Sequence, residues 1–330
     1  MAVHRTIWNL PKVLFQPFEA IEDDREIALV CSPAAFAAVA DRLRGVSFVS
    51  RIEPLQADLA HWDALLPDVR GEVIYAVGGG LAVDAAKYFA IKHELPLVSL
   101  PTALSVDAFL TWASGVRREG CVYYIETKPP EILIVDFEVL ANAPASIRAA
   151  GICDVLSIAT GSADWRLAHE HGKNPPHAPY IRYADDAAAA ILAGALECAE
   201  AAGRGDAEGL KQLLDCLALE VQLCNQLGHS RPEEGSEHYF AYAVENVMGK
   251  GLPHGDLVGP GILVIAALQG LDWLPLKRAL QACNIPLTNI PEPVIRATLA
   301  ELPAYVTRHG LAWGIAHMLE SRDLLLPSLA

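Results

Sequence analysis

Short, almost wholly apolar runs alternate with helix-like segments in the first half of the chain. We predict strands at four such runs, residues 26–31, 72–77, 97–100 and 131–136. Between the runs, residues 33–43 and 81–92 carry Ala-rich patterns that are typical of helices. Continuous apolar strands separated by helices indicate a parallel sheet that is covered on both faces. The first half is therefore expected to be an α/β domain.

The pattern changes near residue 145. From there on, apolar residues recur at helical spacing, as in residues 187–202 and 210–227, and strand-like runs disappear. Clusters rich in Gly and Pro separate the helical segments, at residues 203–209, 228–232, 249–253 and 286–293. We predict two domains, an α/β domain over residues 1–145 and an all-α domain over residues 146–330.

Composition and charge exclude several classes of protein. The chain has 330 residues, 52% of them apolar, which is enough to build a sizeable core. Its 25 Lys and Arg against 40 Asp and Glu give a net charge of −15, so a nucleic-acid partner is not expected. The longest apolar stretch, residues 257–268, is too short to span a membrane. No secretory signal is recognisable and the seven cysteines are scattered, so we expect a cytoplasmic protein with reduced thiols and no stable membrane insertion.

Three consecutive glycines, Gly78, Gly79 and Gly80, follow the second predicted strand, and Asp84 and Lys87 lie on the helix that they open. Glycines at the start of a helix let a phosphate group approach free backbone N–H groups. A tight strand-to-helix turn that needs glycine for a positive φ explains the same pattern equally well. The spacing is not the GxGxxG of an ordinary dinucleotide fold.

The segment after the third predicted strand is rich in hydrogen-bonding side chains: Thr102, Ser105 and Asp107. Ligands of α/β proteins bind in the crevice outside the carboxyl ends of the strands, which is where this segment is expected. A capped helix start is an equally good interpretation of these residues.

One carboxylate and two imidazoles, Asp154, His238 and His254, form a set of the kind that holds a catalytic zinc or iron ion with a coordination position left open. Chance is a serious alternative, because the chain has eleven histidines. His169 and His171 form a further His-x-His pair, which we interpret as a solvated helix end.

Taken together, these motifs resemble those of the sn-glycerol-1-phosphate dehydrogenase family, within the superfamily that also contains glycerol dehydrogenase, iron-containing alcohol dehydrogenases and dehydroquinate synthase. The resemblance covers about residues 10–286. Its matching stretches are Gly78–Lys87, Pro101–Asp107, Asp154, Asp164–Ala168, Gly235–His238 and His254-Gly255. It implies an N-terminal Rossmann-like domain, a C-terminal helical domain and an active-site cleft between them.

The resemblance also implies roles for single residues. Asp154, His238 and His254 are expected to bind one divalent metal ion, commonly Zn²⁺, with Fe²⁺ or Ni²⁺ as alternatives. Asp107 and Asp154 are expected to contact the substrate. The residues expected around NAD(H) or NADP(H) are Gly78, Gly79, Gly80, Asp84, Thr102, Ser105 and Thr111. Thr111 stands where the family usually has a serine.

The implied activity is a metal-dependent NAD(P)H oxidoreductase that interconverts glycerol 1-phosphate, or a similar small polyol phosphate, and dihydroxyacetone phosphate. A homo-oligomer is expected. The alternatives are a dehydrogenase of an unphosphorylated polyol, a carbocycle synthase of the dehydroquinate synthase type that recycles bound NAD, and a binding protein that has lost turnover. The Asp154 ligand and the Gly-Ser-Glu-His sequence argue against the synthase, and the metal-binding set argues against the binding protein.

The chain departs from the family pattern at the substrate side. Tyr242 stands where this branch usually has a histidine, Asp107-Ala108 replaces Asp-Gly, and Asp256 replaces a glutamate. Tyr242 lies one helical turn after His238, so we expect it to line the substrate pocket and to alter its preference. The alternative is a helix residue that only packs. Ser32, where NAD-preferring relatives often have an acidic residue, predicts that NADPH is accepted.

Overall fold

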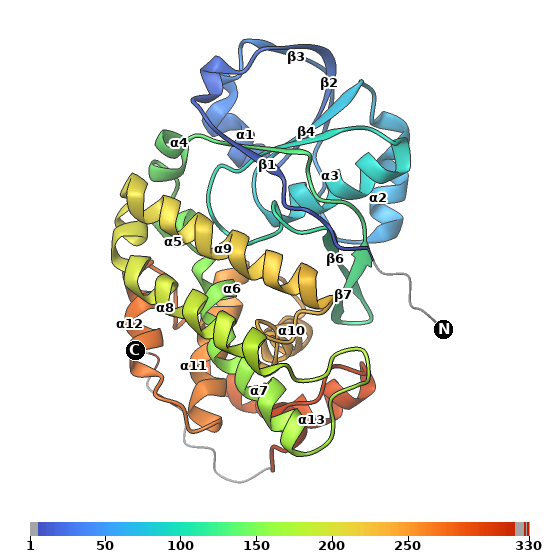
Figure 1. Ribbon diagram of the computed structural model, residues 1–330. Helices are drawn as coiled ribbons and strands as arrows, with labels where there is room; N and C mark the ends of the chain where they lie inside the picture. The colour runs from blue at the N-terminus through green and yellow to red at the C-terminus, as the bar shows by residue number, and fades with distance from the viewer. Residues whose placement is uncertain (1–5, 321–326, 328, 330) are drawn as a thin grey trace.

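The computed structural model describes residues 6–320, 327 and 329. Its N-terminal part is built on a six-stranded sheet in the order β1-β8-β5-β4-β2-β3, in which all neighbouring strands are parallel (Figure 1). The strands are β1 (Lys12–Phe15), β2 (Asp23–Cys31), β3 (Val46–Ile52), β4 (Val73–Val77), β5 (Leu97–Leu100) and β8 (Ile132–Val135). The four strands predicted from apolar runs are β2, β4, β5 and β8, whereas β1 and β3 were not predicted.

Both faces of the sheet are covered, which explains the continuous apolar runs. Alternate residues of β2 enter two separate cores. Leu29 packs in one core with Val39 of α1 (Pro33–Val39), and Val30 packs in the other with Phe89 of α3 (Gly80–His93). Since successive side chains of a strand point to opposite faces, a strand buried on both sides must be apolar at every position. The predicted parallel α/β sheet is confirmed.

A small hairpin projects from the sheet toward the helical part of the molecule. Its strands, β6 (Ala113–Arg118) and β7 (Cys121–Glu126), are joined by Glu119 and Gly120, which both have positive φ, at 53° and 74°. This is the backbone of a tight two-residue hairpin turn. The hydroxyl of Tyr305 donates to the Gly120 carbonyl at 2.9 Å, which fixes the hairpin to the C-terminal helices.

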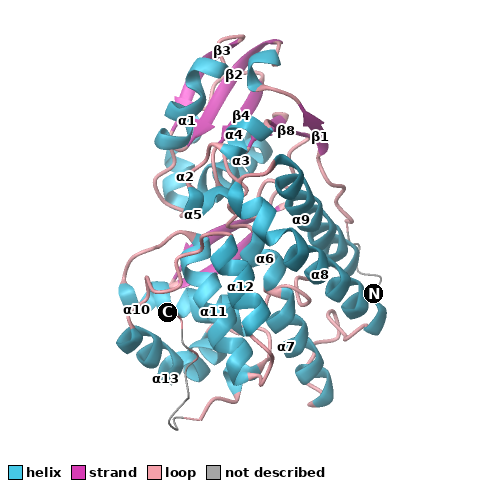
Figure 2. Cartoon of the chain, turned by 90° about the vertical axis from the view of Figure 1, so that its left-hand side faces the viewer, coloured by secondary structure: helices cyan, strands magenta, loops and turns pink. Residues whose placement is uncertain are grey.

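After β8 the described residues contain helices and no strand (Figure 2). The short helices of this part are α4 (Phe137–Ala141), α5 (Ala145–Arg148) and α6 (Ile152–Leu156), whereas α2 (Leu59–Leu65) lies between β3 and β4. The longer ones are α7 (Ile158–Glu170), α8 (Arg182–Arg204), α9 (Ala207–Leu227), α10 (Ser236–Met248), α11 (His254–Leu268), α12 (Leu274–Ala282) and α13 (Glu292–Arg308). One hydrophobic core continues from the sheet into these helices. The boundary between the two predicted domains, at residues 145 and 146, stays a prediction.

Helix α11 is the most apolar helix and is buried along most of its length. It has 15 residues, and within the described part of the chain no helix combines the length and apolar character that crossing a membrane requires. All seven cysteines are unpaired thiols, as expected, and six of them are buried.

Candidate active site

A cavity of 610 Å³ lies where the sheet meets the helices. Its walls come from the start of α3, the loop that follows β5, the β6–β7 hairpin, α6, the end of α9, the loop before α10, α10 itself and the start of α11. The chain leaves β2 toward β3 on one side and returns to β4 on the other, so the strand order reverses between β2 and β4. The cavity lies beside this reversal, beyond the ends of β4 and its neighbour β5. Crevices at such a reversal, beyond the carboxyl ends of the strands, are the usual ligand sites of open α/β sheets.

The glycine turn after β4 brings backbone close to this cavity. Gly78 has a φ of +133°, which only glycine adopts without strain, and a Cβ there would lie 2.9 Å from Ser32 Oγ. A Cβ on Gly79 would lie 3.0 Å from Ser105 Oγ, and Gly80 begins α3 at the cavity wall. The free N–H groups of this 14-residue helix therefore start at the cavity, beside a backbone without side chains. These features fit the pyrophosphate of a nicotinamide cofactor.

An ion pair on α3, between Asp84 and the buried Lys87, fastens this helix to the segments beside it. The Lys87 side chain is fully buried, and its ammonium group lies 2.9 Å from Asp84 Oδ1. The same ammonium donates to the carbonyls of Ala108, Thr111 and Ala113. Asp84 also accepts from the Gly115 N–H at 3.2 Å. Helix α3, the loop carrying Thr111 and the hairpin are thus fastened to one another through two charged side chains.

Asp154, His238 and His254 meet at the helical side of the cavity. Their potential ligand atoms all lie within 4.8 Å of one another. His254 Nε2 lies 2.6 Å from Asp154 Oδ1, and His238 Nε2 lies 3.9 Å from the same oxygen. Asp154 and His238 are buried and His254, at the start of α11, is partly exposed to the cavity. A hard carboxylate and two imidazoles facing one point fit a divalent ion such as Zn²⁺, with room for a further ligand from the cavity.

Glu237 orients the His238 ring. Its Oε1 lies 2.9 Å from His238 Nδ1 and also accepts from the Gly235 N–H at 2.6 Å. A carboxylate on one imidazole nitrogen leaves the other nitrogen as the metal ligand, which is the usual arrangement behind metal-bound histidines. Burial lowers the pKa of His238, but the hydrogen bond and charge of Glu237 outweigh burial and raise this pKa to about 9.

The start of α10 is held by a second buried carboxylate, that of Asp164 on α7. It accepts hydrogen bonds from the backbone N–H of Ser236 at 2.8 Å and of Ile315 at 2.8 Å, and from Gln269 at 2.8 Å. A Cβ on Gly235 would lie 3.0 Å from Asp164 Oδ2. The Asp-Trp and Gly-Ser-Glu-His motifs of the sequence are therefore in direct contact, and this contact sets the position of His238.

Asp107 lies next to the metal-binding set. Its backbone N–H donates to Asp154 Oδ2 at 3.1 Å, and its side chain faces the cavity. Burial and the nearby negative charge of Asp154 raise the pKa of Asp107 to about 7. A carboxyl group in this place can accept a hydrogen bond from a substrate hydroxyl, or donate one when it is protonated.

Tyr242 lines the cavity and takes part in a chain of hydrogen bonds there. Its hydroxyl donates to Glu234 Oε1 at 2.9 Å and lies 3.1 Å from the hydroxyl of Tyr124 on β7. The other oxygen of Glu234 accepts from Ser230 Oγ at 2.6 Å. Burial, together with the charge of Glu234, raises the pKa of Tyr242 well above its usual value, so it is a neutral hydroxyl.

The structure brings most of the predicted residues to one cavity: Gly80, Asp84, Ser105, Asp107, Thr111, Asp154, His238, Tyr242 and His254. Gly78, Gly79 and Thr102 lie outside the lining, and the roles of all these residues stay predictions. His169 and His171 are exposed at the end of α7. The segment from Pro101 to Asp107 is a loop and does not start a helix.

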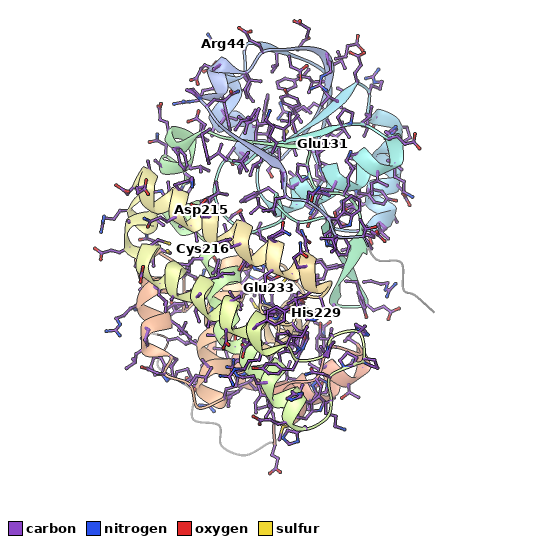
Figure 3. The ribbon with its side chains drawn as sticks, in the orientation of Figure 1. Arg44, Glu131, Asp215, Cys216, His229 and Glu233 are labelled. Atoms are coloured by element: carbon purple, nitrogen blue, oxygen red, sulfur yellow. The ribbon has the colours of Figure 1, made fainter. Side chains whose placement is uncertain are left out.

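Sequence reasoning missed four residues of the site region. Glu237 was visible within the Gly-Ser-Glu-His motif, and its place before His238 was a usable signal. Tyr124, Glu233 and Glu234 carry no such signal, because their place in the cavity depends on the hairpin and on the turn between α9 and α10. Figure 3 labels Glu233 in this region, near the end of α9.

Comparison with known proteins agrees with this geometry. Residues 21–144 match the family model described as iron-containing alcohol dehydrogenase. The chain is 31% identical, over 71% of its length and 68% of the relative's, to "Glycerol-1-phosphate dehydrogenase [NAD(P)+]" of Pyrococcus furiosus. It is 30% identical to the protein of the same name from Hyperthermus butylicus, over 79% and 76% of the two chains.

Among solved structures, a probable glycerol dehydrogenase from Sinorhizobium meliloti 1021 superposes with a TM-score of 0.69 at 18% identity, covering 99% of this chain and 96% of that one. This likeness shows the fold: an N-terminal parallel sheet with helices and a helical C-terminal part. The sequence relatives show the family. The chain therefore belongs to the glycerol-1-phosphate dehydrogenase family of NAD(P)-dependent alcohol dehydrogenases, within the iron-containing alcohol dehydrogenase superfamily.

Proposed function

We propose that the protein is a metal-dependent NAD(P)H oxidoreductase that interconverts a small polyol and its ketone. One observation carries the proposal: Asp154, His238 and His254 converge in the same cavity onto which the glycine turn and the start of α3 open. A hydride donor bound along α3 and a carbonyl held at the metal-binding set would then meet in one enclosed space. The overall reaction takes up one hydride and one proton per ketone reduced.

The residues of the cavity have separable roles in this proposal. Asp154, His238 and His254 would hold the ion, with Zn²⁺ as the expected metal. When bound, the ion supplies Lewis-acid polarisation of the substrate oxygen, and the nicotinamide supplies or accepts the hydride. Asp107 would orient a substrate hydroxyl beside the reacting carbon. Gly80, Asp84, Ser105 and Thr111 would position the cofactor, because they line the same wall.

Two substrate classes compete. Glycerol 1-phosphate and dihydroxyacetone phosphate are supported by the names of the relatives and by the motif match. An unphosphorylated polyol is supported by the cavity, because Arg117 is the only Lys or Arg among its described lining residues. A carbocycle synthase, which recycles its bound NAD, is disfavoured by the family match. The homo-oligomer and the cytoplasmic location stay predictions.

The test is consumption of free NADH and NADPH by zinc-loaded protein, followed by absorbance at the reduced-nicotinamide band. The panel contains dihydroxyacetone, dihydroxyacetone phosphate and several keto sugars. We expect stoichiometric oxidation of the cofactor with at least one ketone, and loss of this activity in Asp154→Asn. Product formation without net oxidation of cofactor would instead indicate a synthase that recycles it.

A further inference from the structure

We infer that the cavity selects against a phosphorylated substrate, and that its physiological substrate is an uncharged hydroxyl-rich polyol or ketose. This inference rests on the proposed function and specifies its substrate class. It depends on one part of the cavity lining, which we call the carboxylate wall. This wall consists of Tyr124, Glu233, Glu234 and Tyr242.

Phosphate groups are bound by cations or by clusters of N–H donors. The long-helix N-termini in the described lining are those of α3, at the glycine turn, and of α11, beside the metal-binding set, so cations would have to hold a phosphate elsewhere in the cavity. Arg117 is the one basic residue of the described lining; its side chain is 51% exposed and pairs with Glu245 at 3.4 Å. Arg231, buried in the same loop as the glutamates, lies outside the lining and donates to the Trp313 carbonyl at 2.8 Å. Lys87 also lies outside the lining and is held by Asp84.

The histidines of the lining do not replace these cations. His229 Nδ1 accepts a hydrogen bond from the Arg231 backbone N–H at 3.3 Å, within the loop that carries both residues. His238 and His254 bind a metal ion only as neutral imidazoles. An ion held by Asp154, His238 and His254 would be the remaining positive charge, and in the proposed function it would polarise the reacting oxygen rather than bind the far end of a substrate.

The carboxylate wall adds negative charge where a substrate's distal group would lie. Both oxygens of Glu234 accept hydrogen bonds, one from Tyr242 and the other from Ser230. A phosphate dianion beside it would be repelled across a medium of low polarity. Glu233 differs: burial raises the pKa of this carboxyl group well above its usual value, and its Oε2 has no hydrogen-bond partner in the protein.

The same wall suits substrate hydroxyls. The neutral phenols of Tyr124 and Tyr242 can both donate and accept, and a free carboxyl oxygen on Glu233 can accept. A substrate hydroxyl can both donate to and accept from these groups, whereas a phosphate oxygen only accepts. Charge and hydrogen-bonding capacity therefore favour the same class of substrate.

The experiment compares matched pairs on zinc-loaded enzyme: dihydroxyacetone against dihydroxyacetone phosphate, and glycerol against glycerol 1-phosphate in the reverse direction. The readout is the ratio of kcat/KM for the phosphorylated member to that for the unphosphorylated member. We expect a ratio below one for the natural chain. In Glu234→Gln the ratio should rise by roughly tenfold, since one unit charge has been removed a few ångströms from the phosphate. Higher ionic strength should raise the ratio in the natural chain and do so less in the variant.

Glu197→Gln is the matched control, because it removes one carboxylate from an exposed position on α8 outside the cavity. Its ratio should equal that of the natural chain. A preference for the phosphorylated member in the natural chain, or an unchanged ratio in Glu234→Gln, would overturn the inference and leave the proposed oxidoreductase intact. Failure to oxidise NADH or NADPH with either pair or with any keto sugar would overturn both.

Discussion

Replacing Glu237 tests how the metal site is positioned without touching a ligand. Glu237 is fully buried, and its Oε1 serves both His238 Nδ1 and the Gly235 N–H, while its Oε2 has no hydrogen-bond partner. In Glu237→Gln the amide oxygen can keep both hydrogen bonds, and the amide nitrogen takes the place of the unpartnered oxygen. The variant therefore removes the negative charge behind His238 and keeps the geometry.

The magnitude follows from the loss of charge. A hydrogen bond to a charged group is worth about 1.5–3 kcal/mol and a neutral one about half as much. At a pH of about 9 or above, where protons no longer compete strongly for His238, Glu237→Gln should therefore cost about 1 kcal/mol, or roughly fivefold to tenfold in metal affinity. Glu237→Ala also strands the buried Gly235 N–H and frees the His238 ring, so the loss should approach about 100-fold, at the upper end for residues behind metal ligands.

The assay is competition for Zn²⁺ against a chromophoric chelator, with circular dichroism and thermal unfolding of the metal-free forms as measures of folding. Glu245→Gln is the control, because Glu245 lies on the same helix and pairs with Arg117 instead of a ligand. The expected order of Zn²⁺ affinity is natural chain, Glu237→Gln, Glu237→Ala. If Glu237→Ala is folded and binds Zn²⁺ as tightly as the natural chain, Glu237 does not position His238 and the reasoning is refuted.

Three further predictions concern the same region. Because the pKa of His238 is raised to about 9, a metal ion must displace a proton from this residue at neutral pH. The Zn²⁺ affinity of the metal-free protein should therefore rise by up to about tenfold per pH unit as the pH rises toward about 9. A flat profile between about pH 7 and about pH 8.5 would contradict this. Ser32 places a neutral hydroxyl beside Gly78, and this hydroxyl does not repel the 2′-phosphate of NADPH as an acidic residue would. The kcat/KM for NADPH should therefore lie within about tenfold of that for NADH. A much larger preference for NADH would argue against a cofactor ribose at Ser32. Lys87→Met leaves Asp84 without its buried partner, so the free energy of unfolding, measured by urea titration, should fall by about 3–5 kcal/mol. A loss below about 1 kcal/mol would show that the ion pair is dispensable for stability.

The sequence was sufficient for the strands that are buried on both faces, because such strands are apolar at every position. The strands that it missed are of a different kind. Strand β1 has four residues and lies at the edge of the sheet. Strand β3, at the other edge, alternates exposed and more buried positions, but Val49 is exposed and Ser50 is buried, so its apolar residues form neither a run nor a regular alternation. Strands β6 and β7 form a separate two-stranded hairpin that ends in charged residues. Strands β1, β3 and β6 lack the long continuous apolar run by which the others were found, whereas β7 has one, at residues 121–125, that was overlooked.

The site was predictable where its residues lie within recognisable local motifs. Asp154, His238 and His254 were proposed from ligand type and from the resemblance, and the structure brings their ligand atoms together. The carboxylate wall was not predictable, because Tyr124 meets Tyr242 only through the packing of the hairpin against α10, and Glu234 meets Tyr242 only through the turn that leads into α10. Contacts between residues 118 positions apart, as for the two tyrosines, are set by tertiary structure and leave no spacing pattern in a single sequence.

The central claim is that Asp154, His238 and His254 hold one divalent ion on which catalysis depends. The most direct measurement is metal content by elemental analysis, together with NADH and NADPH oxidation, for the natural chain and for His254→Ala after loading with Zn²⁺ and desalting. His254 is partly exposed at the start of α11, so its removal should leave the fold intact. The account predicts one ion per natural chain, and in the variant a strong loss of bound metal and no turnover. Full metal occupancy in folded His254→Ala, or no bound metal in the loaded natural chain, would contradict it.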